Sequence, residues 1–278
     1  MQIERISENV YWFQSEIYAQ ATAGVIVGPQ WAVVIDTLAM PEETLELRRY
    51  IEEDLHLPVR YIINTHHHAD HSWGNCFFPG STVIAHELCR QEMINRGFDA
   101  LENAAVHDPQ FKQTKLILPH LTFSEGSIQL LVGKKHLNIF STPGHSADGI
   151  SVLVDEDRVL FAGDAFLPIP FIVDGDINQM RASLKMIGTL SLENVVQGHG
   201  DVILRGEIQD AIDNNLSYLD KAENAVNKII AEGKPIDALQ KITVDSCGKS
   251  RIFLNGIAEQ LHQGNLRTLY QRIKKANQ

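Results

Sequence analysis

The sequence has few cysteines, no long apolar run and no cluster of basic residues, and each absence excludes a class of protein. Its three cysteines, Cys76, Cys89 and Cys247, form an odd and widely spaced set, which argues against a disulfide framework and matches no zinc-thiolate pattern. No apolar run is long enough to span a bilayer, and the first residues lack the basic and apolar regions of a signal peptide. These absences predict a soluble, cytoplasmic protein without a membrane partner.

Basic residues are outnumbered by acidic ones, 24 against 35, so the formal net charge is −11. An acidic chain repels phosphate backbones, and no run of Lys or Arg offers a local basic groove, so we expect no nucleic-acid partner. The hydrophobic fraction of 44% and the charged fraction of 21% are those of an ordinary globular protein. A chain of 278 residues is long enough for one large α/β domain with a substantial core.

Strand patterns dominate the first two thirds of the chain. Short β-branched or alternating apolar runs, bounded by turn residues, predict strands at 10–14, 24–27, 32–35, 59–63, 82–85, 127–131, 137–140, 150–154, 159–161 and 195–196. Helices interrupt them at 41–55, 87–95 and 178–187. Pro41 suits the first turn of the first helix, and Leu45, Leu47, Ile51 and Leu55 should form its buried face. Residues 97–119 have no clean period, and we expect a loop or a helical insertion there.

The pattern changes after Arg205. Apolar residues recur at three- and four-residue steps from 208 to 229, which predicts a long amphipathic helix that stops near Gly233 and Pro235. Two further helices are expected at 252–263 and 266–273. We therefore predict one β-rich domain over residues 1–204 and a helical C-terminal extension, 205–278, packed on that domain.

Candidate metal ligands follow four of the predicted strands. The run His66-His67-His68-Ala69-Asp70-His71 comes directly after the strand at 59–63, and His145, Asp164 and His199 each lie in a short Gly-containing loop after a later strand. If these strands are neighbours, their C-terminal loops converge on one edge of the sheet. Imidazole and carboxylate are donors that suit zinc, and also iron or manganese.

The spacing within the histidine run predicts which side chains act together. In an extended segment His66 and His68 point to the same side and can ligate one ion, while Asp70 and His71 follow at a turn and can reach a second. His67 points the opposite way, so we interpret it as solvent-facing or packing, without a role in the site.

The six-residue pattern His-x-His-x-Asp-His, followed in order by His145, Asp164 and His199, resembles the metallo-β-lactamase superfamily over roughly residues 10–200. The resemblance implies an α/β fold, an αββα sandwich with two divalent metal ions at one edge, zinc being favoured. It implies that His66, His68 and His145 hold the first metal, that Asp70, His71 and His199 hold the second, and that Asp164 bridges them. Asp36 matches an early aspartate that supports such sites from behind the ligands.

This site predicts a binuclear metallo-hydrolase. A metal-bound hydroxide would attack the carbonyl of a small-molecule ester, lactone, thioester or amide, with Asp70 as the catalytic residue that accepts a proton. The full ligand set is like that of glyoxalase II and the N-acyl-homoserine lactonases. The lactonases, however, usually carry a Tyr shortly after the bridging Asp, and here Asp164 is followed by Ala165, Phe166 and Leu167. A homodimer is left open.

Two other activities remain as alternatives. One is β-lactam hydrolysis, against which Asp164 argues because true zinc β-lactamases of this pattern generally lack a bridging Asp. The other is an iron-dependent oxidoreductase of the persulfide dioxygenase type. The substrate should depend on the insertion at 97–119 and on an apolar segment after Asp164; Phe166, Leu167, Ile169 and Phe171 either line a pocket or belong to the core.

Overall fold

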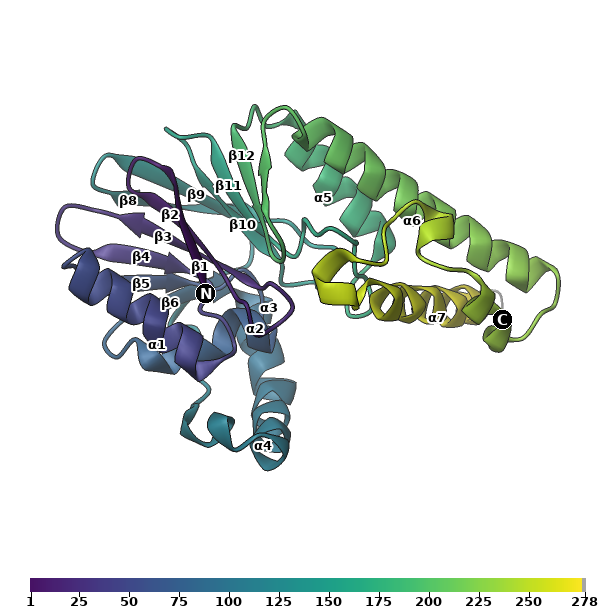
Figure 1. Cartoon of the computed structure of the whole chain (residues 1–278), viewed down its shortest axis with the longest axis horizontal. Helices are drawn as coiled ribbons and strands as arrows, with labels where there is room; N and C mark the ends of the chain where they lie inside the picture. The colour runs from purple at the N-terminus through teal and green to yellow at the C-terminus, as the bar shows by residue number, and fades with distance from the viewer. Residues whose placement is uncertain (277–278) are drawn as a thin grey trace.

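The computed structural model, which describes residues 1–276, is a sandwich of two β-sheets with helices on both outer faces (Figure 1). The predicted αββα sandwich is confirmed. The first sheet has seven strands in sequential order: β1 (Gln2–Ser7), β2 (Val10–Gln14), β3 (Thr22–Val27), β4 (Ala32–Ile35), β5 (Val59–Ile63), β6 (Thr82–His86) and β7 (Leu121–Phe123). The second has six in the order β13 (Val202–Leu204), β12 (Asn194–Gln197), β11 (Val159–Gly163), β10 (Ile150–Val154), β9 (Lys135–Ser141) and β8 (Ser127–Val132).

Strand direction brings the loops that carry the candidate ligands to one edge. In the first sheet β4, β5, β6 and β7 run parallel, and in the second β11 and β12 run parallel. The loops after β4, β5, β11 and β12 therefore leave their sheets at C-terminal strand ends. An isolated bridge between Ala21 and His199 joins the two sheets at this edge.

The core between the sheets comes from the inward faces of both. Ile35 and Ile63 of the first sheet share an apolar cluster with Val152, Phe161 and Val196 of the second. These β-branched and aromatic side chains suit closely packed strands. The short edge strands β1, β7 and β13 were not expected from the sequence, because three to six partly exposed residues give a weak apolar pattern.

Helix α1 (Pro41–Arg49) covers the outer face of the first sheet and begins at Pro41 as predicted. A π-type turn, Tyr50–Asp54, extends it. Leu47 and Ile51 are buried against Val34 and the sheet, but Leu45 is 42% exposed, so its place on the buried face was wrong.

The region expected to be a loop or helical insertion is helical up to Gln113, and residues 114–119 have no regular secondary structure. After α3 (Glu87–Glu92) and a π-type turn at Met93–Gly97, α4 (Phe98–His107) and a 3₁₀ turn at Pro109–Gln113 follow. Figure 1 shows α4 projecting away from the sandwich. Its single buried residue, Leu101, explains why no regular apolar period marks it in the sequence.

Three helices form a second lobe beside the second sheet: α5 (Ile177–Thr189), α6 (Ile208–Ala231) and α7 (Ala258–Ala276) (Figure 1). They share one apolar cluster with residues on the outer face of the second sheet, such as Leu160 and Val195. The boundary at residues 204 and 205 stays a prediction. No helix within residues 1–276 is long and apolar enough to cross a membrane.

The two helices predicted at the C-terminus are in fact one, α7, because tertiary contacts accommodate the Gly264-Asn265 pair that reads as a break. The Asn265 side chain donates to the Pro170 carbonyl and accepts from the Ile172 backbone N–H, so a polar residue is satisfied inside the protein. A Cβ at Gly264 would already touch Phe171 at 3.4 Å. Residues 252–257 form an irregular turn instead of a helix, with Leu254 and Asn255 at φ of 53° and 56°.

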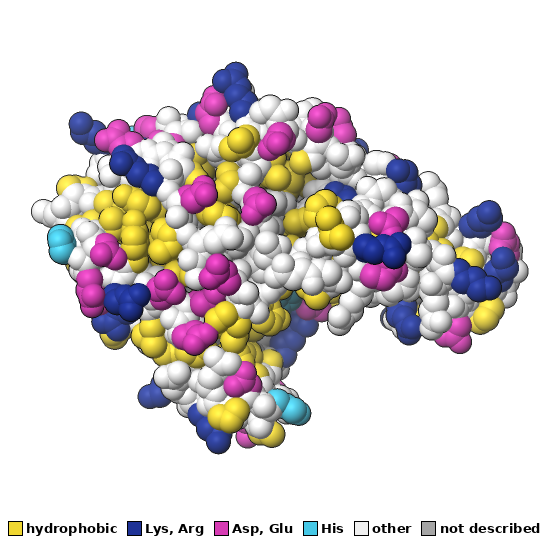
Figure 2. Space-filling model, in the orientation of Figure 1, with side chains coloured by type: hydrophobic (Ala, Val, Ile, Leu, Met, Phe, Trp, Pro, Cys, Tyr) yellow, Lys and Arg dark blue, Asp and Glu magenta, His cyan; other side chains and the backbone are white. Residues whose placement is uncertain are grey.

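Charged side chains are mixed on the face drawn in Figure 2. Lys and Arg are scattered among Asp and Glu there and do not gather into one basic patch. This distribution agrees with the net acidic charge and offers a polyanion no continuous surface on that face.

Candidate metal centre

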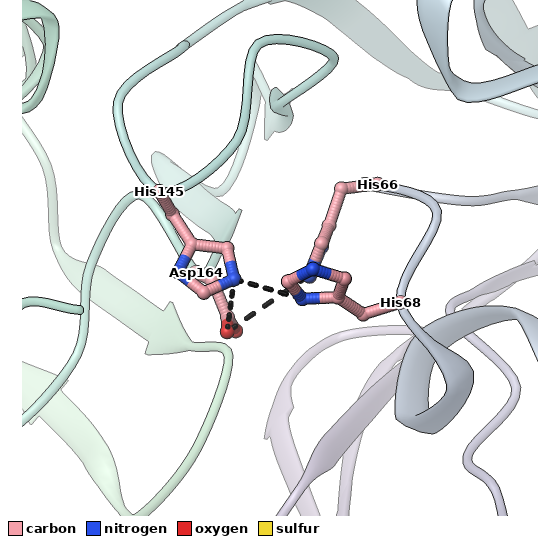
Figure 3. A group of neighbouring side chains, drawn as sticks. All are labelled: His66, His68, His145 and Asp164. Carbon is pink, nitrogen blue, oxygen red and sulfur yellow. Dashed lines mark hydrogen bonds and ion pairs between the residues drawn. The ribbon is translucent and has the colours of Figure 1, made fainter. Parts of the chain in front are cut away.

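The seven predicted ligands come together at the edge of the sandwich where the strand-end loops meet. Figure 3 shows His66 and His68, which follow β5, pointing across the gap toward His145 and Asp164, which come from loops of the second sheet. The site thus joins the two sheets, and neither sheet carries it alone.

The first donor group consists of His66, His68 and His145, with Asp164 beside them. His145 Nε2 lies 2.9 Å from His68 Nδ1 and 3.2 Å from Asp164 Oδ2. His66 Nε2 lies 3.9 Å from the same Asp164 oxygen. Nitrogen ligands on a tetrahedral zinc ion stand roughly 3.3 Å apart, so these atoms are at ligand spacing.

The second donor group consists of Asp70, His71 and His199. His199 Nε2 lies 3.2 Å and His71 Nε2 3.9 Å from Asp70 Oδ2. Asp164 faces this group with its other oxygen: Oδ1 lies 3.3 Å from His71 Nε2 and 3.7 Å from His199 Nε2. One carboxylate therefore presents one oxygen to each donor group.

Hydrogen bonds on the far side of each ring fix the nitrogen that faces the site. His66 Nδ1 contacts Thr65 Oγ1 at 3.1 Å, while the Nδ1 atoms of His71, His145 and His199 each lie 2.8 Å from an oxygen of Asp36, Phe171 and Ala19, respectively. His68 is reversed, since its Nε2 donates to Asp174 at 3.0 Å and its Nδ1 faces the site. Such partners are typical of metal-ligating histidines.

The residues fit metal ions on two counts. His66 Nε2, His71 Nε2 and Asp164 Oδ1 are buried without a hydrogen-bond partner among residues 1–276, an arrangement that costs free energy unless something else satisfies these atoms. In addition, His68 Nδ1 and His145 Nε2 face each other with lone pairs, because the proton of each ring is used on the other side. A cation bound between these two nitrogens would remove their repulsion, because both lone pairs would ligate it.

The ionisation of His66 and His145 in the first donor group supports the same interpretation, whereas the rings of the second group are held by carboxylates. Burial lowers the pKa of His66, and it lowers the pKa of His145 to about 4, so both rings are neutral donors at neutral pH. Burial opposes the charged form of His71 and His199, yet the Asp164 carboxylate raises the pKa of both. Burial alone would raise the pKa of Asp164, but the surrounding imidazoles hold it well below its usual range.

Asp36 lies where the sequence predicted support for the ligands. It follows β4 in the left-handed region, with a φ of 57°, which is uncommon for a residue other than glycine. The turn lets its buried carboxylate accept from the Thr65 N–H at 2.7 Å and from the Thr65 hydroxyl at 2.6 Å while contacting His71. The backbone of Asp36 is therefore strained, and this strained conformation places its carboxylate where it orients the histidine run.

His67 does not face solvent, and that part of its interpretation was wrong. Its side chain is 7% exposed, and its Nδ1 lies 3.0 Å from both oxygens of the buried Asp148, which also accepts the His67 backbone N–H at 2.8 Å. Arg96 Nη2 donates to His67 Nε2 at 3.0 Å. Alternation alone could not reveal this, because both partners are distant in sequence.

A cavity of about 410 Å³ opens beside the two donor groups. Most of its walls are apolar and come from four separate parts of the chain: Trp73, Ala100, Leu167, Phe171, Leu254, Ile257 and Leu261. The segment after Asp164 contributes to both the cavity and the core. Leu167 and Phe171 line the cavity, whereas Phe166 and Ile169 belong to the core.

Four polar residues near the ligands were missed by the sequence analysis: Tyr18, Arg96, Asp148 and Asp174. Tyr18 and Arg96 line the cavity, and Arg96 donates to Asp174, which in turn accepts from His68. None lies in a metal-ligand pattern. For Asp148 a weak signal exists, since it is an acidic residue only three positions after His145.

The match to known families agrees with this geometry. Residues 19–206 match the family model described as "Metallo-beta-lactamase superfamily", which is well over half of the chain. The chain belongs to that superfamily.

Three curated relatives show what kind of protein this chain is similar to. It is 25% identical over 191 residues to a beta-lactamase-like protein 2 homolog of Caenorhabditis elegans (68% of this chain, 58% of the relative). It is 26% identical over 190 residues to the thioesterase pkgB of Emericella nidulans (66% and 47%), and 24% over 226 residues to the human acyl-coenzyme A thioesterase MBLAC2 (70% and 79%). The matched region covers only 58% and 47% of the length of the first two relatives.

Solved structures share the fold at low sequence identity. A metallo-beta-lactamase from Pontibacter korlensis superposes with a TM-score of 0.61 at 21% identity, over 76% of this chain and 97% of that one. The sec-alkylsulfatase Pisa1 from Pseudomonas sp. superposes with a TM-score of 0.75 at 15% identity, over 97% of this chain and 50% of that one. The second similarity extends over the C-terminal helices.

Proposed function

We propose that this protein is a binuclear metal-dependent hydrolase that cleaves a small-molecule carbonyl compound, with a thioester or ester of an apolar acyl group as its preferred substrate. The observation that carries the proposal is Asp164, whose Oδ2 faces His145 at 3.2 Å while its Oδ1 faces His71 at 3.3 Å. A carboxylate shared in this way suits two ions held side by side.

The residues would divide the work as their geometry suggests. His66, His68 and His145 would hold one ion, Asp70, His71 and His199 the other, and Asp164 both. Zinc is the favoured metal because the donors are imidazole and carboxylate, with iron or manganese as alternatives. Two such ions supply Lewis acidity for a carbonyl oxygen and lower the pKa of a bound water to about 7.

Asp70 is the proposed proton acceptor. It lies on the cavity wall, and the neighbouring imidazoles of His71 and His199 lower its pKa although burial opposes this. An ionised carboxylate at this position can take the proton of the attacking water and can also orient that water.

The cavity walls support an apolar acyl group as the bound part of the substrate. Leu167, Phe171, Ile257 and Leu261 offer a hydrocarbon chain or ring apolar surface directly beside the donor groups. Two of the three relatives described above are thioesterases by name, which favours a thioester over an amide. Arg96 also lines the cavity, but its guanidinium group already pairs with Glu92 and Asp174.

Metal analysis and a substrate panel test the proposal. Purified protein should contain about two divalent ions per chain and should hydrolyse acyl thioesters and esters faster than nitrocefin or a phosphodiester, with loss of activity on chelation. One iron per chain together with oxygen-dependent persulfide oxidation would instead support the dioxygenase alternative. Nitrocefin as the fastest substrate would support the β-lactam alternative.

A pair of histidine variants provides the control. His66→Ala should lower metal content and abolish hydrolysis, because it removes a buried donor of the first group. His107→Ala should do neither, since His107 is exposed and bonds only within its own helix. Full activity and full metal content in His66→Ala would contradict the ligand assignment.

A further inference from the structure

Tyr18 lies at the rim of the cavity, on the loop between β2 and β3. It lines the cavity together with Asp70, Asp164 and His199, and the residue is 46% exposed. An exposed tyrosine at a rim could be a chance surface residue. The loop that carries it is, however, tied to the metal centre and to the helical layer.

Two sets of contacts hold the Tyr18 backbone in place. On one side the Tyr18 N–H donates to Ser15 Oγ at 2.8 Å, and Ser15 in turn donates to the buried Glu43 of α1 at 2.5 Å. On the other side the carbonyl of the next residue, Ala19, accepts from His199 Nδ1 at 2.8 Å. The residue after Tyr18 thus orients a candidate ligand, which fixes the distance between the tyrosine and the site.

The hydroxyl group of Tyr18 is free to bind a substrate. None of the side-chain hydrogen bonds among residues 1–276 uses it. The ordinary pKa of a tyrosine is about 10, so the phenol is protonated at neutral pH. Tyr18 lines the same cavity as Asp70 and Asp164. It is a neutral O–H donor next to the place where a carbonyl group must react.

We infer that Tyr18 is a catalytic residue that donates a hydrogen bond from its hydroxyl group to the carbonyl oxygen of the bound substrate as negative charge develops there. The inference rests on the proposed function.

The chemistry of the step determines which substrate atom Tyr18 contacts. A water oxygen forms a bond to the carbonyl carbon, its proton passes to Asp70, and the π electrons of the C=O bond move onto the carbonyl oxygen. The electron pair on the oxyanion then re-forms the C=O bond as the C–S or C–O bond breaks, and the leaving group departs with the bonding electrons. The proton held by Asp70 passes to the leaving group or to solvent. Thiols have a pKa of about 8.5, so a thiolate needs no proton from a phenol, whose ordinary pKa is about 10. The developing oxyanion is therefore the atom that gains most from this donor.

Tyr18→Phe is the direct test, because it removes only the hydroxyl group, which holds no part of the fold. Loss of one oxyanion donor lowers kcat by about 10²–10³-fold in well-enclosed sites. For a half-exposed donor we expect a decrease in kcat of roughly 10- to 100-fold with little change in KM. Tyr61→Phe is the matched control, since Tyr61 stacks on Trp31 away from the cavity.

Three measurements distinguish the assigned role from a structural one. Metal content and melting temperature should be equal in the wild type, Tyr18→Phe and Tyr61→Phe. In a series of aryl thioesters and esters, the loss in Tyr18→Phe should be the same for all leaving groups. A tetrahedral phosphonate, followed by calorimetry, should bind Tyr18→Phe about tenfold more weakly, and Tyr61→Phe as the wild type does.

Several outcomes overturn the inference. If the wild type hydrolyses the series and Tyr18→Phe does so within twofold, Tyr18 is not catalytic. If the loss grows with the pKa of the leaving group, Tyr18 acts on the leaving group and the assignment to the carbonyl oxygen is wrong. If the metal-loaded wild type cleaves no member of the series, the proposed function itself fails, and the Tyr18 assignment with it.

Discussion

The donor groups and the cavity wall lie side by side but are built in different ways. The donors come from short loops after strands and from the short helix α2 (Ala69–Ser72), they are mostly buried, and each imidazole is fixed by a second hydrogen bond. The cavity wall comes from segments that are distant in sequence, among them the Tyr18 loop and the C-terminal turn at 252–257. This difference suggests that the fold holds the chemistry constant while its appended parts select the substrate.

The comparison makes a general prediction about mutations. Changes at the donor groups should reduce activity toward all substrates equally, because they remove the chemistry. Changes at the wall should alter the ranking of substrates and leave metal content unchanged. Five specific predictions follow, in order of decreasing effect.

Asp164→Asn should have the largest effect. The amide keeps the shape of the side chain but loses the negative charge shared between the two donor groups. We expect metal content to fall to one ion per chain or fewer and kcat/KM to fall by at least about 10³-fold for every substrate. Elemental analysis and steady-state kinetics check both. Two ions retained with near-normal rates would refute the bridging role.

Gly198→Ala tests whether the position of Asp164 is as tightly defined as the distances imply. A Cβ at Gly198 would lie 1.8 Å from Asp164 Oδ1, 2.8 Å from the Gly163 carbonyl carbon and 2.9 Å from the Asp164 backbone nitrogen, so the carboxylate and the backbone that carries it must both move. A displacement of about 1 Å can reduce a rate by about 10²-fold, and we expect a loss of that size. Gly206→Ala is the control, because no atom lies within 4 Å of the added Cβ. Equal activity in both variants would show that Asp164 tolerates displacement.

Asp148→Ala should act on stability more than on chemistry. The buried Asp148 carboxylate accepts from the His67 backbone and ring, and its removal leaves these donors unpaired, at a cost of about 2–4 kcal/mol in the free energy of unfolding. Urea unfolding measures the loss. Glu125→Ala, at an exposed turn, should change stability by less than about 0.5 kcal/mol.

The Asp148 carboxyl group also makes the free energy of unfolding depend on pH. Burial disfavours ionisation, but His67 lowers the pKa of Asp148 to about 2 from its ordinary value of 3.8. A lowered folded-state pKa stabilises the protein above pH 3.8, and this stabilisation is lost as the pH falls toward 2. The wild type should therefore lose more stability between pH 4 and pH 2 than Asp148→Ala does.

Ile257→Trp should have the smallest effect on overall activity but should change specificity. Ile257 is part of the cavity wall, and a larger ring there reduces the space for an acyl group. We expect the ratio of kcat/KM for long over short acyl chains to fall by roughly 10-fold, with metal content unchanged. Ile252→Trp is the control, because Ile252 is 76% exposed and does not line this cavity. An unchanged ratio would show that the C-terminal turn does not select the substrate.

Local sequence predicted much of the fold and nearly all of the donor set. The strands β5 and β10 have the predicted bounds. Every residue of β10 is buried, which leaves a nearly continuous apolar run, whereas β5 carries the exposed Arg60 and ends in the buried Ile62 and Ile63. Predictions failed where contacts between distant residues overrode local pattern. Gly264 and Asn265 read as a helix break, yet Asn265 finds its hydrogen bonds in residues 170 and 172 and α7 continues. Leu45 fitted the helical period but lies on the exposed side.

The sequence by itself identified the candidate donors, because His66, His68, Asp70 and His71 lie within six residues directly after the strand β5, so they must lie close together in any fold. Only the tertiary structure decided what surrounds them. Asp174 and Arg96 reach His68 and His67 from segments far away in the chain, and Tyr18 reaches the cavity from the opposite sheet to Asp164. Such contacts depend on how two sheets and a helical lobe pack, and no local spacing encodes that packing.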